Sequence, residues 1–368
     1  MKRFPGKVGL IQRVLPAYRA PFFDTLADAC QGGLGVFAGS PRPAEMIHTA
    51  EALDQAHLTR GVNLHLFSGR AYLCLQFGLL RWLGAWHPEV LIVEANPRYL
   101  RTAAAVRWMR RRGHPMIGWG LGAPPLSGPL ASLRRQRRAR FIQQFDALIT
   151  YSRTGAEEYA QLGFPADRIF TAVNAVTPPP AHPLTDRPPL ASGQRARALF
   201  VGRLQARKLV DQLLQTCADL PQDLQPELVI VGDGPDRPRL QTLAAQVYPR
   251  AAFTGALFDD DLAAQFRAAD LFVLPGTGGL AVQQAMSYGL PVIAAEADGT
   301  QADLVRPANG WQVPPGDPDA LRAALLTALS DIPRLRKMCA ESYRIVAEEV
   351  NLEQMVAVFV EALNRSAA

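Results

Sequence analysis

Short apolar runs alternate with helical patterns along the first half of the chain. Apolar residues with helical spacing occupy 21–29, and 101–112 is a second helical stretch with a basic face. Buried strands that alternate with helices are typical of a parallel, doubly wound sheet. The first half is therefore predicted to be a Rossmann-like α/β domain. Its predicted strands are 7–15, 35–37, 90–94, 115–119 and 147–151.

A proline-rich stretch separates this series from a second one. Residues 177–191, TPPPAHPLTDRPPLA, contain six prolines, which neither a helix interior nor a central strand tolerates. We interpret 177–195 as an exposed linker. The predicted domains are 1–176, with a final helix 352–367 packed back on it, and 196–350. The second series has predicted strands at 199–201, 228–231, 252–254, 271–274 and 292–295, with helices such as 210–217 and 262–269 between them.

The predicted fold is thus α/β, with two Rossmann-like domains facing a cleft. Ligands of open α/β sheets bind beyond the carboxyl ends of the strands. The length of 368 residues suffices for two domains, and 48% hydrophobic with 20% charged residues excludes a disordered or fibrous chain. The four cysteines form no C-x-x-C pair, so we expect reduced thiols, no metal site and a cytosolic setting.

Charge is distributed unevenly. Residues 1–175 carry 22 Lys and Arg against 11 Asp and Glu, a balance of +11, whereas the rest of the chain balances at −5. The most apolar stretch, 71–86, is interrupted by Arg81 and is too short to span a bilayer. Two arginine clusters occur near Trp82, Trp86 and Trp108. The clusters are Arg107, Arg110, Arg111 and Arg112, and Arg134, Arg135, Arg137, Arg138 and Arg140.

Arginine-rich surface with nearby tryptophan suits an anionic headgroup layer. We therefore predict peripheral contact with the inner face of the cell membrane. A merely solvated basic face is the alternative. Nucleic-acid binding is disfavoured because no recognition motif accompanies the charge.

Two turns carry candidate phosphate chemistry. The first, 199–204 (LFVGRL), leads from a buried strand into Gly202 and Arg203, with Lys208 five residues on. Two cations beside a helix N-terminus suit a diphosphate, although two solvated surface cations are an equal alternative. The second, 275–280 (PGTGGL), leaves backbone N–H groups open to phosphate oxygens, although a plain tight turn explains it as well.

The order and spacing of several motifs resemble the nucleotide-binding domain of the retaining, GT-B-fold glycosyltransferases of family four. A third turn, 231–235 (VGDGP), is by itself best explained as structural. The resemblance covers about 196–330 and is fainter earlier, at Ser152 and Asn174. The matching positions are Val201-Gly202-Arg203 with Lys208, 231–235, Ala285-Met286, Gly289 with 291–293, Asn309-Gly310, and Asp317-Pro318 with Leu321.

The resemblance implies that Arg203 and Lys208 hold the diphosphate of a nucleoside-diphosphate sugar, a UDP- or GDP-sugar, without metal or cofactor. Transfer would retain the anomeric configuration. The base would stack at 255–257, and loop N–H groups would assist the diphosphate. The predicted donor-binding residues are Gly202, Gly255, Leu257, Gly276, Thr277, Gly278, Gly279, Leu280 and Gln284.

The chain departs from the family pattern at three positions. Alignment on Ala285-Met286 places Gly276 and Gln284 where the family has two glutamates, and Gly120 where it commonly has a histidine. The amide of Gln284 can still hydrogen-bond a ribose hydroxyl, whereas Gly276 offers only backbone. The contact to the donor sugar must therefore differ or come from elsewhere.

The family's Gly-rich acceptor loop is also missing from the first strand–helix turn. Polar side chains that follow the predicted strands are instead the candidates for acceptor binding, and ordinary surface residues are the alternative. Glu94 is the candidate for an acid/base contact, against a structural carboxylate. The candidate acceptor-binding residues are Arg13, Tyr18, Arg19, Asn96, Arg98 and Gly120.

The sequence therefore predicts a metal-independent hexosyltransferase in which Arg203, Lys208 and Glu94 carry the chemistry. The expected acceptor is lipid-linked or a polysaccharide precursor. One alternative is a catalytically silent protein that binds a nucleotide sugar. A sugar-nucleotide epimerase and a non-enzymatic membrane scaffold are the others.

Overall fold

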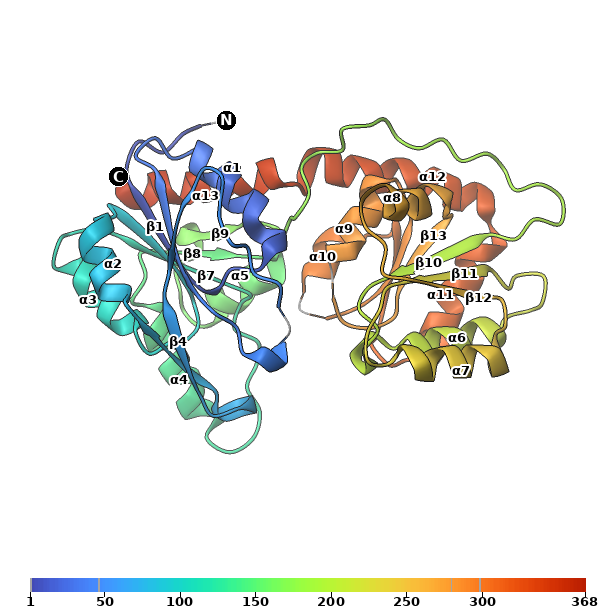
Figure 1. Cartoon of the computed structure of the whole chain (residues 1–368), viewed down its shortest axis with the longest axis horizontal. Coiled ribbons are helices and arrows are strands. Elements are labelled where there is room, and N and C mark those ends of the chain that lie inside the picture. Colours follow the sequence, from blue (N-terminus) through green and yellow to red (C-terminus); the bar gives the residue numbers. More distant parts are fainter. Residues whose placement is uncertain (1, 46, 279, 298) are drawn as a thin grey trace. The chain divides into compact units, whose positions relative to one another are not determined.

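The computed structural model describes residues 2–45, 47–278, 280–297 and 299–368. The chain divides into two compact units (Figure 1): residues 1–176 with 352–368, and residues 177–351. Each unit is built on a parallel sheet flanked by helices. The prediction of two parallel-sheet α/β domains is confirmed.

The sheet of the first unit has seven strands in the order β3-β2-β1-β6-β7-β8-β9, all parallel. The central strands are buried on both faces, as parallel sheets require. Because the strands are all parallel, their carboxyl ends meet at one edge of the sheet. The strands are β1 Val8–Val14, β2 Leu34–Gly39, β3 His57–Arg60, β6 Val90–Glu94, β7 Met116–Gly120, β8 Ala147–Thr150 and β9 Ile169–Thr171.

A separate antiparallel hairpin, β4 (Val62–Leu66) with β5 (Leu73–Phe77), was not predicted. The apolar residues of β4 alternate with polar ones, but Val62 and Leu64 are exposed, so the pattern marks no core-facing side. The helices of this unit are α1 Ala20–Asp28, α2 Leu79–Trp86, α3 Thr102–Arg110, α4 Ala131–Ile142, α5 Arg153–Gln161 and α13 Leu352–Ala367.

The last helix, α13, belongs to the first unit (Figure 1). Phe359 is fully buried, with its ring centroid 4.9 Å from Phe22 on α1 and 5.0 Å from Trp119 on β7. Edge-to-face pairs of this kind contribute about 0.5–1.5 kcal/mol each beyond their buried area. Aromatic packing therefore ties the chain's end to its beginning.

The second unit contains six parallel strands in the order β12-β11-β10-β13-β14-β15. Helix α8 begins at Asp259, earlier than predicted, because three aspartates in its first turn favour the positive end of the helix dipole. The strands are β10 Arg197–Val201, β11 Glu227–Val231, β12 Ala251–Gly255, β13 Leu271–Leu274, β14 Val292–Ala295 and β15 Gly310–Val313. The helices are α6 Val210–Ala218, α7 Arg237–Val247, α8 Asp259–Ala268, α9 Leu280–Ser287, α10 Thr300–Leu304, α11 Pro318–Ser330 and α12 Ile332–Arg344.

The proline-rich segment that begins the second unit has no helix or strand, but it packs on the unit. Arg187 donates hydrogen bonds to the carbonyls of Ala269 and Phe266, and the Tyr343 hydroxyl donates to the carbonyl of His182. The extended segment is therefore held along the surface of the second unit.

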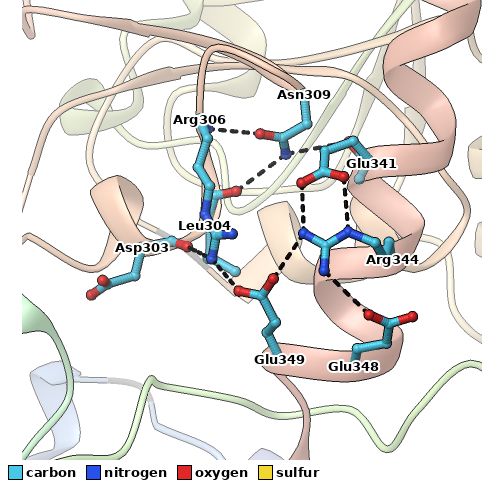
Figure 2. A network of polar contacts seen from close by, with 9 residues as sticks. Asp303, Leu304, Arg306, Asn309, Glu341, Arg344, Glu348 and Glu349 are labelled. Carbon is cyan, nitrogen blue, oxygen red and sulfur yellow. Dashed lines mark hydrogen bonds and ion pairs between the residues drawn. The ribbon is translucent and has the colours of Figure 1, made fainter.

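A network of arginines and glutamates connects the loop before β15 to the end of α12 (Figure 2). Arg306 donates to Glu349 at 2.6 Å, and Arg344 donates to Glu341 at 2.7 Å and to Glu349 at 2.8 Å. Asn309, fully buried, accepts from the backbone N–H of Arg306 and donates to the carbonyl of Leu304. Asn309, which matches the family pattern in sequence, thus stabilises this loop.

The network predicts a loss of stability in acid. The Arg306 hydrogen bond lowers the pKa of Glu349 below its ordinary value of 4.5, and Arg344 does the same for Glu341. A carboxyl group with a lowered pKa stabilises the fold at pH values above its ordinary pKa. This stabilisation is lost as the pH falls through the folded-state pKa. Arg306→Gln should cost about 1 kcal/mol at pH 7, because the pair is only partly buried.

The measurement is urea unfolding of both proteins between pH 3 and 7. Once the pH falls below the folded-state pKa of Glu349, which is itself below 4.5, the two should be equally stable, because Glu349 is then protonated. Arg365→Gln, which removes the exposed 3.8 Å pair with Glu361, is the matched control and should change little at any pH. A constant Arg306→Gln difference across the pH range would contradict this account.

The four cysteines are all buried and unpaired. Burial raises the pKa of the Cys30 and Cys217 thiols to about 12 and also raises that of Cys74 and Cys339. Within the described residues, no helix is long and apolar enough to cross a membrane. The same residues contain no group of three His, Cys, Asp or Glu side chains placed to bind a metal ion.

Candidate functional site

The three glycine turns of the second unit lie at the carboxyl edge of its sheet. They follow β10, β11 and β13, which are neighbours in the parallel order. The turn after β11 supports the turn after β10, since the Leu204 N–H donates to the Asp233 carbonyl at 2.9 Å. A Cβ on Gly232 would lie 1.9 Å from the Gly202 carbonyl oxygen. Backbone packing therefore explains the glycine of the turn after β11.

Lys208 joins the first turn to the loop after β13. Its ammonium donates to the Thr277 carbonyl at 2.6 Å, and the Thr277 N–H donates to the Arg207 carbonyl at 3.1 Å. Gly278 has φ +134°, and a Cβ there would lie 2.2 Å from Lys208 Nζ. The structure thus brings together two of the predicted diphosphate-binding segments, which are about 70 residues apart in sequence.

Gly276 is required by the same close approach. A Cβ at this position would lie 2.3 Å from the Arg207 carbonyl oxygen and 2.5 Å from the Lys208 carbonyl carbon. Both obstacles are backbone atoms, which cannot rotate away as a side chain does. The glutamate that the family resemblance leads one to expect at 276 is therefore sterically excluded from this conformation.

The pKa of Lys208 is lowered to about 8, first by burial and then by the charge of Arg207. If the ammonium binds the diphosphate, affinity for a nucleoside diphosphate should fall as pH rises above about 8, by up to about tenfold per unit. Lys208→Arg keeps its charge at these pH values and should bind with little pH dependence. Calorimetric titration with GDP or UDP at pH 6.5–9.5 measures the difference, and equal slopes in the two proteins would refute it.

The other predicted donor residues lie around this core. Arg203, half-buried, follows Gly202 at the end of β10, and Gln284 is half-buried on α9, which begins at Leu280. Gly255, with φ +82°, ends β12 and is followed by half-buried Leu257. Gly279 lies outside the described residues.

Two residues at this edge escaped prediction. Arg207 donates to the side chain and carbonyl of Thr277. Gln301, 1% exposed, donates to the Gly278 carbonyl at 3.0 Å, and its own side-chain oxygen is buried without a hydrogen bond. Arg207 could have been predicted from the sequence, because it is adjacent to Lys208. Gln301 could not, because it lies in a short helix far along the chain.

In the first unit, Arg13 and Glu94 meet at the carboxyl ends of β1 and β6. The backbone N–H of Arg13 donates to the Glu94 carboxylate at 3.0 Å, and Tyr99 also hydrogen-bonds that carboxylate. Burial raises the pKa of Glu94. The Arg13 guanidinium forms an ion pair with Glu45 at 2.9 Å. Glu94 therefore connects two strand ends and holds a carboxyl group whose proton is retained to higher pH.

Arg19 forms a second, separate group. Its guanidinium donates to the Asn174 side chain at 2.5 Å and lies 5.8 Å from the ring centre of Trp119 and 5.4 Å from that of Tyr151. Arg19 is 8% exposed, and its Nη1 is buried without a hydrogen bond. The neighbouring Tyr18 is half exposed.

Gly120, at the end of β7, packs against α5. A Cβ there would lie 2.6 Å from the Tyr159 hydroxyl oxygen and 3.2 Å from the Ala95 Cβ. A histidine here would require the buried Tyr159 side chain to move, whereas at 276 the obstacle is backbone. Asn96 accepts from the backbone N–H of Arg98 within its own turn, and the Arg98 side chain is exposed.

Family comparisons match both units. The family described as "Glycosyl transferases group 1" matches residues 195–331, and the "Glycosyl transferase 4-like domain" matches residues 32–175. A GDP-mannose-dependent alpha-mannosyltransferase of Mycolicibacterium smegmatis is 40% identical over 163 residues, which are 41% of this chain and 40% of that protein. The match thus spans about two fifths of that relative's length.

Solved structures resemble the whole chain. The lipopolysaccharide outer core galactosyltransferase WaaB in its apo form has a TM-score of 0.70 at 18% identity, covering 98% of this chain and 99% of its own. Anabaena Alr3699/HepE in complex with UDP has a TM-score of 0.68 at 16% identity, covering 99% and 100%. The predicted GT-B fold is confirmed. With one glycosyltransferase domain matched in each unit, the chain belongs to the family 4 glycosyltransferases.

Proposed function

We propose that this protein transfers a sugar from a nucleoside-diphosphate sugar to a lipid-linked or glycan acceptor, with retention of configuration and without metal. The observation that carries the proposal is the junction of Lys208 with the loop after β13. That junction gathers a cation and a glycine loop at the carboxyl edge of a parallel sheet, where α/β folds bind nucleotides. A GDP-sugar is the first donor to test, since the mycolicibacterial relative is named GDP-mannose-dependent.

Leaving-group stabilisation is the chemistry that these residues can supply. Arg203 and Lys208 would neutralise the diphosphate as the bond to the sugar breaks, and backbone N–H groups of the loop would add hydrogen bonds. A leaving phosphate oxygen would then take the proton of the acceptor hydroxyl. Gln284 would contact a donor hydroxyl, and the base would lie near Gly255 and Leu257.

The acceptor would bind in the first unit. Arg13, Tyr18 and Arg19 follow β1, Asn96 and Arg98 follow β6, and Gly120 ends β7. The unpaired, buried Nη1 of Arg19 is a donor that an acceptor oxygen would satisfy. The raised pKa of Glu94 supports an acid/base contact for it.

We further propose peripheral contact with an anionic membrane, at its cytoplasmic face. The support is the arginine-rich pair of helices α3 and α4, next to exposed Leu121, Leu130 and Leu133. Arginines beside exposed leucines fit the boundary between headgroups and acyl chains. A lipid-linked acceptor would be reached from that surface.

A catalytically silent nucleotide-sugar-binding protein is the second candidate. The glycines at 276 and 120 favour it, because both positions lack the family's reactive groups. An epimerase has less support, since it would need several carboxylates and histidines near the donor.

The test is an assay of GDP- and UDP-sugars with lipid extracts and glycans as acceptors. We expect nucleotide release that depends on the acceptor, and a product whose anomeric configuration, read by NMR, matches the donor. Tight donor binding without transfer or hydrolysis for any donor would establish the silent protein instead. A product of inverted configuration would contradict the retaining mechanism.

A further inference from the structure

Four arginines line one hollow of the first unit, at the carboxyl edge of its sheet. Arg98 comes from the segment after β6, and Pro125 and Leu126 come from the segment after β7. The other three arginines, Arg134, Arg137 and Arg138, lie on α4. The hollow has a volume of about 490 Å³, which is within the usual range for small-molecule sites, roughly 300–1,000 Å³.

The positive charge in this hollow is only partly offset by the protein. Over the residues that the structure describes, no carboxylate lines the hollow and none of its four arginines forms an ion pair. Burial lowers the pKa of Arg138; the charge of Glu158 raises it, and the charges of Arg98 and Arg134 lower it. Glu158 does not line the hollow, and its carboxylate accepts a hydrogen bond from the N–H of Ala123 at 2.7 Å.

Two of the arginines have a structural task and two do not. Arg134 donates to the Ser127 carbonyl at 2.5 Å, and Arg138 donates to the Pro124 carbonyl at 2.8 Å, so both hold the segment after β7 in place. The side chains of Arg98 and Arg137, in contrast, make no hydrogen bond within the described part of the chain. Like charges held together without a structural partner indicate a ligand that carries the opposite charge.

We infer that the hollow formed by Arg98, Arg134, Arg137 and Arg138 binds a phosphate or diphosphate group, and that this group belongs to the acceptor. One guanidinium group can donate two parallel hydrogen bonds to phosphate oxygens. Four such groups match the charge of a diphosphate better than that of a single carboxylate. The link to the acceptor rests on the transferase function proposed above, whereas the anion site itself does not.

A concave site differs from a flat membrane-facing surface. Arg98 lies on a different segment from the α4 arginines, and together they line an open hollow rather than extend along one helix face. Arg107 on α3 and Arg140 on α4 do not line it. A diffuse attraction to headgroups would depend on all exposed arginines alike, and this contrast makes the two explanations separable.

The experiment is calorimetric titration of the full chain with inorganic pyrophosphate. We expect two sites, one in this hollow and one at Arg203 and Lys208. The pair Arg98→Gln with Arg137→Gln should weaken the first site by about a hundredfold, tenfold for each charge-assisted contact. Arg203→Gln with Lys208→Gln should remove the other site only. Arg107→Gln with Arg140→Gln loses the same charge and should keep both.

Equal pyrophosphate affinity in the Arg98/Arg137 variant and its charge-matched control would overturn the site. If the Arg98/Arg137 variant loses this pyrophosphate site but the unmodified protein transfers no sugar, the anion site is upheld and the proposed function is contradicted. Vesicles containing phosphatidic acid separate the sources of the phosphate. A lipid-borne group predicts weaker vesicle binding by the Arg98/Arg137 variant than by its control, whereas a soluble acceptor predicts equal vesicle binding by both.

Discussion

Replacing both Arg203 and Lys208 by glutamine should weaken binding of the nucleoside diphosphate by at least about a hundredfold. Each cation would contribute a charge-assisted contact worth about 1.5–3 kcal/mol, and a loss of 1.4 kcal/mol is a tenfold change in affinity. Of the two single variants, Lys208→Gln should lose more affinity than Arg203→Gln, because the Lys208 ammonium already contacts the glycine loop at Thr277. Calorimetry with GDP and UDP measures the effect.

A charge-matched control distinguishes a site from general electrostatics. Arg322 on α11 and Lys337 on α12 are exposed, and their replacement by glutamine removes the same charge. That variant should bind as the unmodified protein does. If the Arg203/Lys208 variant also binds with unchanged affinity, the diphosphate does not lie at this junction.

Installing the family's glutamate by Gly276→Glu should lower donor binding and transfer by about a hundredfold or more, rather than improve them. The new Cβ would meet the backbone of Arg207 and Lys208, so the loop after β13 must move away from Lys208. Overpacking of this kind also costs about 1–3 kcal/mol of stability. Transfer kinetics, nucleotide binding and urea unfolding report the three effects.

Two companion variants isolate the cause. Gly276→Ala adds only the Cβ and should reproduce most of the loss, because the collision is with that atom. Gln284→Glu introduces the other family glutamate at a half-buried position on α9 and should be tolerated. An active Gly276→Glu variant would mean that the loop relaxes at little cost, and the steric account would then be wrong.

The fold was largely predictable because buried parallel strands are short, continuous apolar runs. Val90–Glu94 and Leu271–Leu274 show this pattern. In the hairpin β4–β5, the strand β4 has no continuous apolar run, and its apolar residues Val62 and Leu64 are exposed instead of buried. Local periodicity identifies a strand only when burial imposes it.

The candidate site was predictable only in part, because the sequence does not show which contact requires a glycine at a given position. Gly232 is explained by the backbone of Gly202, and Gly276 by the backbone of residues 207 and 208. These contacts join positions that are distant in sequence. The same limit applies to the arginines of α4, whose helical spacing gave no sign of a partner at Arg98.

The burial of all four cysteines makes this protein a ready scaffold for site-directed labelling. Thiol reagents attack the thiolate, and the native thiols combine raised pKa values with enclosure in the core. A cysteine introduced at exposed Ser127, beside the arginine hollow, would then be the fast-reacting one. A fluorophore placed there, with no background mutations, would report the arrival of an anionic ligand in real time.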